Sequence, residues 1–191
     1  MTEIEQAEAK AAHRSSLRAS RAERAHDSDE AARLSEQLGQ YCIDNKVGTA
    51  AAYLPIAGEP DITDFLNWAL SKSIELMLPR VSGNELRWVK FDGSTASGEL
   101  GFEEAAGKPA KLSDADVIFM PALAVDLKGN RLGKGKGYYD RALEPFRGQK
   151  RRPKFAAVVF DEEVVMAVAA EAHDQAVDLA ITASKLIWFN R

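Results

Sequence analysis

Short runs of consecutive apolar residues, separated by segments with helical spacing, limit the possible fold of this chain more than any other feature. Three such runs lie at 116–121, 154–160 and 177–181. A run without polar alternation is typical of a strand that helices cover on both faces. Helical segments are expected between these strands at 138–146 and 162–172. The pattern predicts a layered α/β domain with a mainly parallel sheet, in which the strand at 116–121 lies centrally.

The N-terminal segment, residues 1–45, is rich in Ala, Glu and Arg and predicts two helices packed on the rest of the domain. The helices break at 25–28, where Asp27 and Glu30 have the spacing of a capping box. The second helix has one apolar stripe, and beside it stands Cys42, the only cysteine of the chain. A small thiol in a helix is more often buried packing than a nucleophile, so we assign it no function.

Three further strands and one helix are expected in the first half of the chain. The strands lie at 50–55, 74–78 and 86–91, and the helix lies at 62–70. A proline ends each of the first two strands, and Asp61 is expected to cap the helix. Residues 92–115 are rich in Gly, Ser, Ala and Glu. A connection of this length is typically a surface excursion or a functional flap, so we predict a mobile loop.

Composition narrows the class of protein. The chain has 191 residues, is 46% hydrophobic and carries a net charge of -4, which fits one globular domain over residues 1–191 and disfavours a nucleic-acid-binding surface. No apolar run approaches the roughly 20 residues of a membrane helix, and the first 40 residues lack the apolar core of a secretory signal. The single cysteine favours a reducing compartment. We therefore expect a cytoplasmic monomer without membrane or nucleic-acid partners.

The segment 128–141 carries the strongest functional signal. Its sequence, Lys-Gly-Asn-Arg-Leu-Gly-Lys-Gly-Lys-Gly-Tyr-Tyr-Asp-Arg, holds four of the 13 glycines and five basic residues. It follows an expected strand and opens an expected helix, where free backbone N–H groups and the helix dipole favour an anion. Glycines allow close approach of the backbone to phosphate oxygens, and Lys and Arg add charged donors. The segment predicts phosphate binding.

Two common phosphate-binding motifs are excluded by counting. Asn130 stands where a Walker A loop needs its first glycine, and Gly137 stands where that loop needs Ser or Thr. A Rossmann pattern fails as well, because Tyr138 and Asp140 occupy the positions where its third glycine could fall. The segment is therefore a different phosphate loop. The alternative interpretation is a glycine-rich surface turn whose lysines are only solvated.

A second basic feature lies on the first expected helix. Arg14, Arg18 and Arg21 are spaced at i, i+4 and i+7, so their side chains share one face. Taken alone, such a stripe is usually a solvated helix face. The three tryptophans are interpreted as packing residues and receive no functional role.

The phosphate loop and several other segments resemble the 5-formyltetrahydrofolate cyclo-ligase family, also called methenyltetrahydrofolate synthetase. The core of the resemblance is Arg-Leu-Gly-Lys-Gly-Lys-Gly-Tyr-Tyr-Asp at 131–140. Further agreement lies at 14–18, 53–55, 59, 61, 78–80, 120–126, 173–174, 178 and 182. The resemblance implies a three-layer α/β sandwich with a mainly parallel, mixed sheet flanked by helices. It also implies MgATP-dependent conversion of 5-formyltetrahydrofolate to 5,10-methenyltetrahydrofolate, with release of ADP and phosphate.

Individual roles follow from the resemblance. Lys136 and Arg131 would be catalytic, and Asp140 and Asp174 would bind Mg2+. ATP would contact Arg14, Ser15, Ser16, Leu17, Arg18, Arg131, Leu132, Gly133, Lys134, Gly135, Lys136, Gly137, Tyr138 and Tyr139. The folate would contact Leu54, Glu59, Lys134, Gly135, Lys136, Gly137 and Tyr138. His173 would support its neighbours by hydrogen bonding. Without the family, both aspartates would be interpreted as ordinary helix or loop acids, and Glu59 as a turn residue.

Four positions depart from the usual family pattern. Ala122 and Val125 replace a common Gly and Phe, and Ala105 and Ala169 stand where prolines are usual. These changes concern pocket shape and substrate preference more than nucleotide binding, because they fall on backbone and packing positions. Three alternatives remain: a non-catalytic folate or nucleotide sensor, an ATP-dependent ligase acting on another amide, and a nucleic-acid-binding module.

Overall fold

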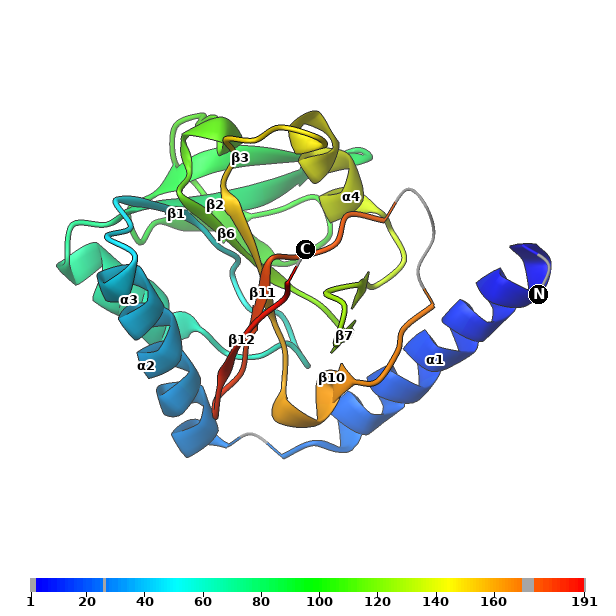
Figure 1. Ribbon diagram of the computed structural model, residues 1–191. Helices are drawn as coiled ribbons and strands as arrows, with labels where there is room; N and C mark the ends of the chain where they lie inside the picture. Colours follow the sequence, from blue (N-terminus) through cyan, green and yellow to red (C-terminus); the bar gives the residue numbers. More distant parts are fainter. Residues whose placement is uncertain (1–2, 26, 170–173, 191) are drawn as a thin grey trace.

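A seven-stranded sheet forms the centre of the protein, with strand order β12-β11-β9-β6-β1-β2-β3 (Figure 1). The computed structural model describes residues 3–25, 27–169 and 174–190. The strands of this sheet are β1 (Thr49–Ala51), β2 (Glu75–Ser82), β3 (Glu85–Phe91), β6 (Val117–Pro121), β9 (Lys154–Val158), β11 (Leu179–Ile181) and β12 (Leu186–Trp188). Only the edge strands β3 and β12 are antiparallel to their neighbours. The predicted α/β fold with a mainly parallel, mixed sheet is confirmed, and β6 is its central strand.

Helical segments cover both faces of the sheet and give it three layers. The helices are α1 (Glu3–Glu23), α2 (Ser28–Asp44), α3 (Thr63–Ser71) and α4 (Tyr138–Leu143), and α4 continues into the short 3-10 helix η2 (Glu144–Phe146). Helices α2 and α3 pack on one face, and α4 with η2 packs on the other. Figure 1 shows α1 set apart at one side of the molecule. None of the helices in the described part of the chain has the length and apolar character needed to cross a membrane.

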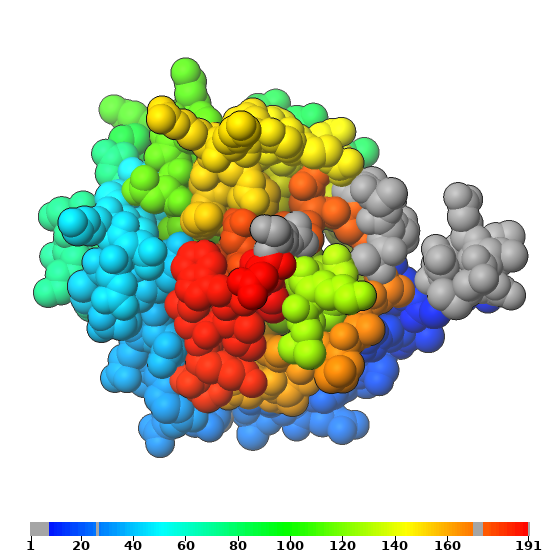
Figure 2. All heavy atoms as spheres, viewed as in Figure 1, coloured from blue at the N-terminus to red at the C-terminus, as the bar shows by residue number. Residues whose placement is uncertain are grey.

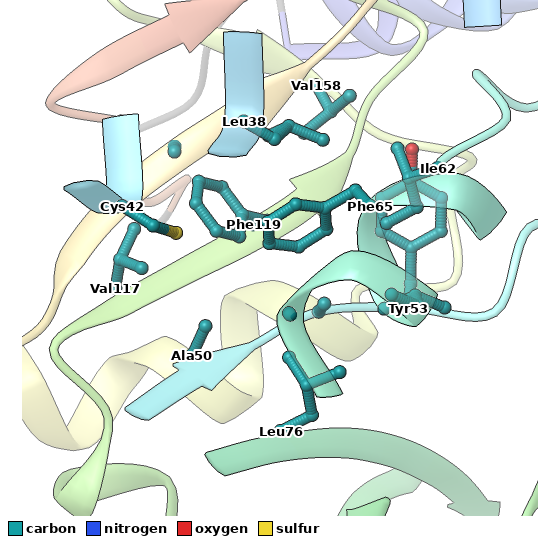
Figure 3. Packing of buried hydrophobic residues seen from close by; sticks show 14 of the residues in the cluster. Leu38, Cys42, Ala50, Tyr53, Ile62, Phe65, Leu76, Val117, Phe119 and Val158 are labelled. Atoms are coloured by element: carbon teal, nitrogen blue, oxygen red, sulfur yellow. The ribbon is translucent and has the colours of Figure 1, made fainter. Parts of the chain in front are cut away.

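The apolar runs form strands because each successive side chain enters a different half of the core. In β6, Val117 and Phe119 face α2 and α3, while Ile118 and Met120 face α4 and η2. The ring of Phe119 meets that of Phe65 from α3 edge-on, with 5.4 Å between the ring centroids (Figure 3). This two-sided burial explains why the strand lacks polar alternation.

Local signals at the helix ends are confirmed in part. The Asp27 carboxylate accepts hydrogen bonds from the N–H groups of Asp29 and Glu30 and caps α2, whereas the Glu30 carboxylate pairs with Arg24. Helix α3 begins one residue later than expected, and Asp61 accepts the Thr63 N–H at 2.9 Å. Cys42 is buried in the core (Figure 3), and burial raises the pKa of its thiol to about 12. This environment agrees with the packing role expected for it.

The strand that was expected to end before Pro79 continues through that residue. Strand β2 reaches Ser82, and Pro79 lies opposite Trp88 of β3. The N–H of Val81 faces away from β3 and donates to the Glu104 carboxylate at 2.9 Å. Pro79 stands two residues earlier and faces the same side, so its missing N–H breaks no bond to β3. The prediction that this proline ends the strand was therefore wrong.

Two small sheets complete the fold. One consists of β10 (Val164–Val165), β7 (Ala124–Asp126) and β8 (Arg131–Leu132), and the other is the hairpin β4 (Thr95–Ser97) and β5 (Glu103–Ala105). The helix expected over 162–172 is wrong for its described part, because a 3-10 turn, η3 (Asp161–Glu163), leads into β10, which pairs with β7. Residues 170–172 lie outside the described part. The expected loop at 92–115 contains the β4–β5 hairpin and η1 (Leu112–Asp114), and its mobility stays a prediction.

Candidate active site

A cavity of about 550 Å3 opens where β1 and β6 end. In open α/β sheets, ligands bind at the carboxyl ends of the strands. Four parts of the chain form most of the walls: helix α1, the segment after β1 with the end of β2, the β4–β5 hairpin, and the phosphate loop that leads into α4. Pro121 at the end of β6 and Asp174 complete them. The lining residues are Lys10, Arg14, Arg18, Tyr53, Leu54, Ile56, Glu59, Pro79, Val81, Leu100, Phe102, Glu103, Glu104, Pro121, Arg131, Gly133, Lys134, Gly135, Lys136, Gly137, Tyr138, Tyr139, Asp140 and Asp174.

The start of the phosphate loop is fixed by the turn between β7 and β8. The buried Asp126 carboxylate accepts the N–H groups of Lys128 and Asn130 and the Asn130 side-chain amide, each at 2.9 Å. Burial alone would raise the pKa of Asp126, but these hydrogen bonds outweigh it and lower that pKa. Gly129 has φ +78, and a Cβ there would lie 2.6 Å from the Val177 carbonyl oxygen. Figure 2 shows this turn beside the C-terminal segment.

The loop then crosses the cavity and enters α4. Gly137 occupies the N-cap position of α4 with φ 65, a left-handed conformation that favours glycine. Gly135 has φ +95 and lies beside the Arg14 side chain. The Tyr138 hydroxyl donates to the Gly83 carbonyl at 3.3 Å and ties this end of the loop to the β2–β3 turn. Both glycines thus allow a path that other residues would strain.

Helix α1 meets the cavity through its basic face. Arg14 donates to the Gly133 carbonyl oxygen at 3.0 Å, and Arg18 donates to the Lys134 carbonyl oxygen at 2.5 Å. Lys10, one turn earlier, pairs with Asp174 at 2.6 Å. Arg21 does not line the cavity. Its guanidinium is buried against the Glu163 carboxylate. Arg14 and Arg18 of the basic stripe therefore belong to the cavity, whereas Arg21 attaches the helix to the domain.

Two further ion pairs join loop cations to carboxylates in the cavity. Arg131 pairs with Asp140 at 2.6 Å, and Lys134 pairs with Glu59 at 2.8 Å. Lys136 is exposed and makes no ion pair with any residue that the structure describes. The predicted metal ligands lie near one another, because the Gln175 N–H, next to Asp174, donates to Asp140 at 3.3 Å.

Two buried tyrosines of the cavity, Tyr53 and Tyr139, stay protonated at neutral pH. Burial and the nearby Glu59 carboxylate raise the pKa values of both Tyr53 and Tyr139. The Tyr53 hydroxyl donates to the Pro60 carbonyl at 2.8 Å, and the Tyr139 ring packs against Trp88. The Glu59 side chain is buried, with 7% exposed, and also accepts the Ile56 N–H at 3.1 Å. These groups form a rigid, hydrogen-bonding wall rather than a set of bases.

The structure brings together most of the predicted site residues. Those that line the cavity are Arg14, Arg18, Leu54, Glu59, Arg131, Gly133, Lys134, Gly135, Lys136, Gly137, Tyr138, Tyr139, Asp140 and Asp174. Ser15 and Ser16 are exposed and do not line it, and Leu17 and Leu132 pack in a small apolar cluster with Leu123. His173 lies outside the described residues. Ala105, Ala122 and Val125 are buried behind the walls.

Sequence reasoning missed part of the site. Lys10 could have been found, because it stands four residues before Arg14 on the same helix face. The hairpin residues Leu100 and Phe102 had only a weak signal, two large apolar side chains within a segment of small and polar residues. Pro79 was assigned to a strand end and not to a site, and Val81 was assigned no role.

Comparisons with known proteins agree with this geometry. A family model described as the 5-formyltetrahydrofolate cyclo-ligase family matches residues 6–183. A Mycolicibacterium smegmatis protein named 5-formyltetrahydrofolate cyclo-ligase is 36% identical over 70% of this chain and 73% of its own length. A mouse protein of the same name is 42% identical over 33% of this chain and 32% of its own.

A solved structure extends the similarity to three dimensions. The Aquifex aeolicus 5,10-methenyltetrahydrofolate synthetase is 28% identical, with a TM-score of 0.81, and the match covers 95% of this chain and 93% of that one. A Mycoplasma pneumoniae 5,10-methenyltetrahydrofolate synthetase, 20% identical with a TM-score of 0.73 over 91% of this chain and 98% of that one, shares the fold. The chain belongs to the 5-formyltetrahydrofolate cyclo-ligase family.

Proposed function

We propose that the protein uses ATP to convert 5-formyltetrahydrofolate into 5,10-methenyltetrahydrofolate, with release of ADP and phosphate. Family membership supports this activity. The structural observation that carries it is a cavity in which basic residues of α1 and of the phosphate loop face the same space as the buried Glu59. The side with the basic residues suits a triphosphate, and the side with Glu59 suits a ring that carries hydrogen-bond donors.

The reaction requires activation of the formyl group. Its oxygen takes the γ-phosphoryl group of ATP and ADP departs. N10 of the folate then attacks the activated carbon and loses its proton, and the C–O bond breaks to release phosphate. An amide-like oxygen leaves poorly until it is phosphorylated. The protein therefore has to align two substrates and neutralise phosphate charge, with little covalent chemistry of its own.

Lys136 is the best candidate for contact with the transferred phosphoryl group. It is exposed at the cavity and holds no carboxylate among the described residues, so its ammonium is available to an anion. Arg131 is buried under the loop and fixed by Asp140. Its guanidinium adds positive charge close to the backbone of the loop. Arg14 and Arg18 would contact the nucleotide from the side of the cavity that α1 forms.

Glu59 and Leu54 are the candidates for folate contact. A buried carboxylate suits the donor edge of a pterin ring, because it supplies acceptors that water cannot easily replace. Its present partner is Lys134, which lies on the phosphate loop. The two substrate sites thus share an ion pair.

The donor set in the cavity also fits Mg2+. This ion is usually held by one or two carboxylates together with phosphate oxygens and water, and Asp140 and Asp174 are two neighbouring carboxylates. Among the residues that the structure describes, no three acidic, His or Cys side chains form a complete metal cage. Mg2+ would supply charge neutralisation for the triphosphate. Arg131 pairs with Asp140 and Lys10 pairs with Asp174, so both carboxylates have defined positions.

A direct assay tests the proposal. Purified protein is incubated with 5-formyltetrahydrofolate and MgATP, and the absorbance of the methenyl product and the amount of ADP are followed together. We expect both to rise in equal amounts. Binding of both substrates without product would identify a non-catalytic sensor. ADP formation only with a different amide substrate would identify another ligase.

A further inference from the structure

Three arginines each donate to a different carbonyl group of the phosphate loop. Arg14 and Arg18 reach two of these carbonyls from α1, and both arginines line the cavity. Arg141 of α4 donates to the third, the carbonyl of Lys136, at 2.8 Å, and its own side chain does not line the cavity. Arg141 therefore holds the loop from outside the space that substrates would occupy.

The same guanidinium binds a second part of the chain. It donates to the Asn84 carbonyl through Nε at 2.8 Å and through Nη2 at 2.5 Å. Asn84 lies in the turn between β2 and β3, the long antiparallel pair of the central sheet (Figure 1). A planar guanidinium has several donors in fixed directions, so it can keep two carbonyl groups in a defined relative position. Arg141 thus connects the phosphate loop to the seven-stranded sheet.

The loop leaves room for this guanidinium. A Cβ at Gly137 would lie 2.8 Å from the Nη1 atom of Arg141, so a larger residue at this position would displace the arginine. The guanidinium carbon lies 5.4 Å from the centroid of the Tyr138 ring, within the range of a cation–π contact. The Tyr138 hydroxyl donates to Gly83 of the same turn. The two loop residues after Lys136 are therefore both adapted to the position of Arg141.

Lys136 depends on such support, because the chain around it is flexible. It stands between Gly135, with φ +95, and Gly137, with φ +65. Glycine restricts the backbone less than any other residue. The Lys136 ammonium makes no ion pair with any residue that the structure describes, so its position follows from the backbone of the loop.

The bond from Arg141 also differs from those of Arg14 and Arg18 in its relation to substrates. The two arginines of α1 would turn from the loop to the nucleotide when it binds. Arg141 lies outside the cavity, so its bond to the loop does not compete with a ligand. It would remain in place during the transfer, when a misplacement of about 1 Å can cost on the order of 100-fold in rate.

We propose that Arg141 is a positioning residue for phosphoryl transfer. It fixes the Lys136 carbonyl to the β2–β3 turn and thereby keeps the Lys136 ammonium aligned with the transferred group. This inference rests on the proposed function and on the role proposed there for Lys136. It gives Arg141 no contact with either substrate.

Steady-state kinetics of Arg141→Met test this role. We expect kcat to fall about 10- to 100-fold, because Lys136 is no longer held in place. The KM for 5-formyltetrahydrofolate and the affinity for a non-hydrolysable ATP analogue, measured by calorimetry, should change less than about threefold, since no substrate contact is removed. Arg141→Lys should recover part of kcat, because an ammonium can still donate to the Lys136 carbonyl.

A double variant shows whether Arg141 acts through Lys136. The combination of Arg141→Met with Lys136→Ala should turn over no more slowly than Lys136→Ala alone, because the lysine that Arg141 positions is already absent. A further loss of about tenfold or more in the double variant would overturn the inference.

Amide hydrogen exchange gives a readout that does not depend on turnover. In Arg141→Met, the segment 131–141 should exchange faster than in the wild-type protein, whereas β9 should exchange at the same rate. Thermal unfolding should be unchanged, because the Arg141 side chain is exposed. Faster exchange throughout the chain would show general destabilisation and would contradict a positioning role.

A matched control and the wild-type protein separate the remaining outcomes. Arg33→Met removes an exposed arginine of α2 that does not line the cavity, and it should alter neither kcat nor loop exchange. Wild-type kcat or wild-type loop exchange in Arg141→Met would overturn the inference. If the wild-type protein binds the ATP analogue but forms no product, the proposed activity fails, and the exchange of the loop still decides whether Arg141 holds it.

Discussion

The ion pair between Lys134 and Glu59 connects the two proposed substrate sites through single residues. Lys134 belongs to the phosphate loop, Glu59 lies on the side proposed for the folate, and their charged atoms lie 2.8 Å apart. A triphosphate bound at the loop would compete with Glu59 for this lysine. Once Lys134 turns to phosphate, the buried carboxylate needs new donors, which a pterin ring provides. Binding of either substrate should therefore favour binding of the other.

Replacing the carboxylate by an amide tests this connection. In Glu59→Gln, Lys134 is free and the cavity loses a negative charge, so we expect ATP to bind about threefold to tenfold more tightly in the absence of folate. Folate should bind more weakly, and its effect on ATP affinity should shrink. Calorimetric titrations with each ligand alone and together measure all three quantities.

A matched control uses an ion pair outside the cavity. Glu75 pairs with Lys90 at 2.9 Å, and both side chains are exposed. Glu75→Gln should leave nucleotide affinity unchanged, because exposed pairs contribute little and this one is remote from the site. Unchanged or weaker ATP binding in Glu59→Gln would contradict the competition for Lys134.

The exposed Lys136 is expected to be essential for turnover. Lys136→Ala should nearly abolish turnover. We expect kcat to fall about 100- to 1000-fold or more, because the variant lacks one charged donor to the transferred group. The fold should be intact, since the side chain is exposed and packs against nothing in the core. Steady-state turnover and thermal unfolding check both parts. Lys111→Ala, an exposed lysine outside the cavity, is the control, and wild-type turnover in Lys136→Ala would remove the loop from the mechanism.

A buried ion pair near the C-terminal end of α1 attaches this helix to the rest of the domain, in addition to its contacts in the cavity and the packing of Leu17. Arg21 and Glu163 have side-chain exposures of 5% and 3%, and Arg21 also donates to the Ala122 carbonyl oxygen at 2.5 Å. The Arg21 guanidinium lies over the Phe160 ring, 5.3 Å from its centroid. The cavity contacts of α1 involve groups that would bind substrates. This pair therefore holds the helix when those contacts change.

Breaking the pair should destabilise the protein and release α1. Arg21→Met leaves the Glu163 carboxylate buried without its partner, which typically costs about 3–5 kcal/mol. The double variant Arg21→Met, Glu163→Leu should lose less than the sum of the single variants, because no buried charge remains. Urea unfolding gives the free energies, and limited proteolysis reports exposure of α1. Additive losses would show that the pair does not hold the helix.

The elements also show how far the sequence could be interpreted. Apolar runs such as 117–120 predicted strands correctly, because a strand that is buried on both faces has no polar residues to interrupt its pattern. Val164, Val165 and Val168 have a spacing compatible with a helix, yet β10 pairs with β7 and Val168 packs with Leu123, so tertiary pairing overrides the local pattern. The β4–β5 hairpin was missed because small and acidic residues give it little strand propensity of their own.

Contacts between distant segments also limited the prediction of the site. The phosphate loop is continuous in sequence, so its glycines and lysines indicated it as part of the site without knowledge of the fold, and the loop does line the cavity. The proximity of Asp140 to Asp174 depends on the path of the chain after α4, and the hairpin meets the cavity only because Glu104 binds β2. Such contacts between distant segments leave no local pattern. The family resemblance pointed to Asp140 and Asp174 as site residues, whereas neither the local sequence pattern nor the resemblance pointed to Phe102.

For the whole molecule, we expect aspartates that join distant segments to contribute strongly to the response to acid. Asp178 accepts two hydrogen bonds from Arg152, at 2.7 and 2.9 Å, and one from the Phe155 N–H at 2.8 Å. Burial alone would raise the pKa of Asp178, but these bonds outweigh it and lower that pKa. The pKa of Asp161 is lowered in the same way, because hydrogen bonds from Ser184 and Thr182 outweigh its burial. With Asp126, three such carboxylates hold the fold together.

These lowered pKa values fix the sign of the pH dependence. A carboxylate whose folded pKa lies below its unfolded value, near 3.9, binds fewer protons in the native state than in the unfolded state. Its contribution to the free energy of unfolding is therefore complete above the unfolded pKa and is lost as the pH falls through the folded pKa. We expect the free energy of unfolding in urea to be steady from about pH 7 to 5 and to decline below about pH 4. Asp178→Asn should be less stable at pH 7, and its difference from wild type should narrow toward pH 3. Asp64→Asn, at an exposed position, should follow the wild-type curve. A constant difference between Asp178→Asn and wild type across this range would show that the Arg152 contact does not act through ionisation.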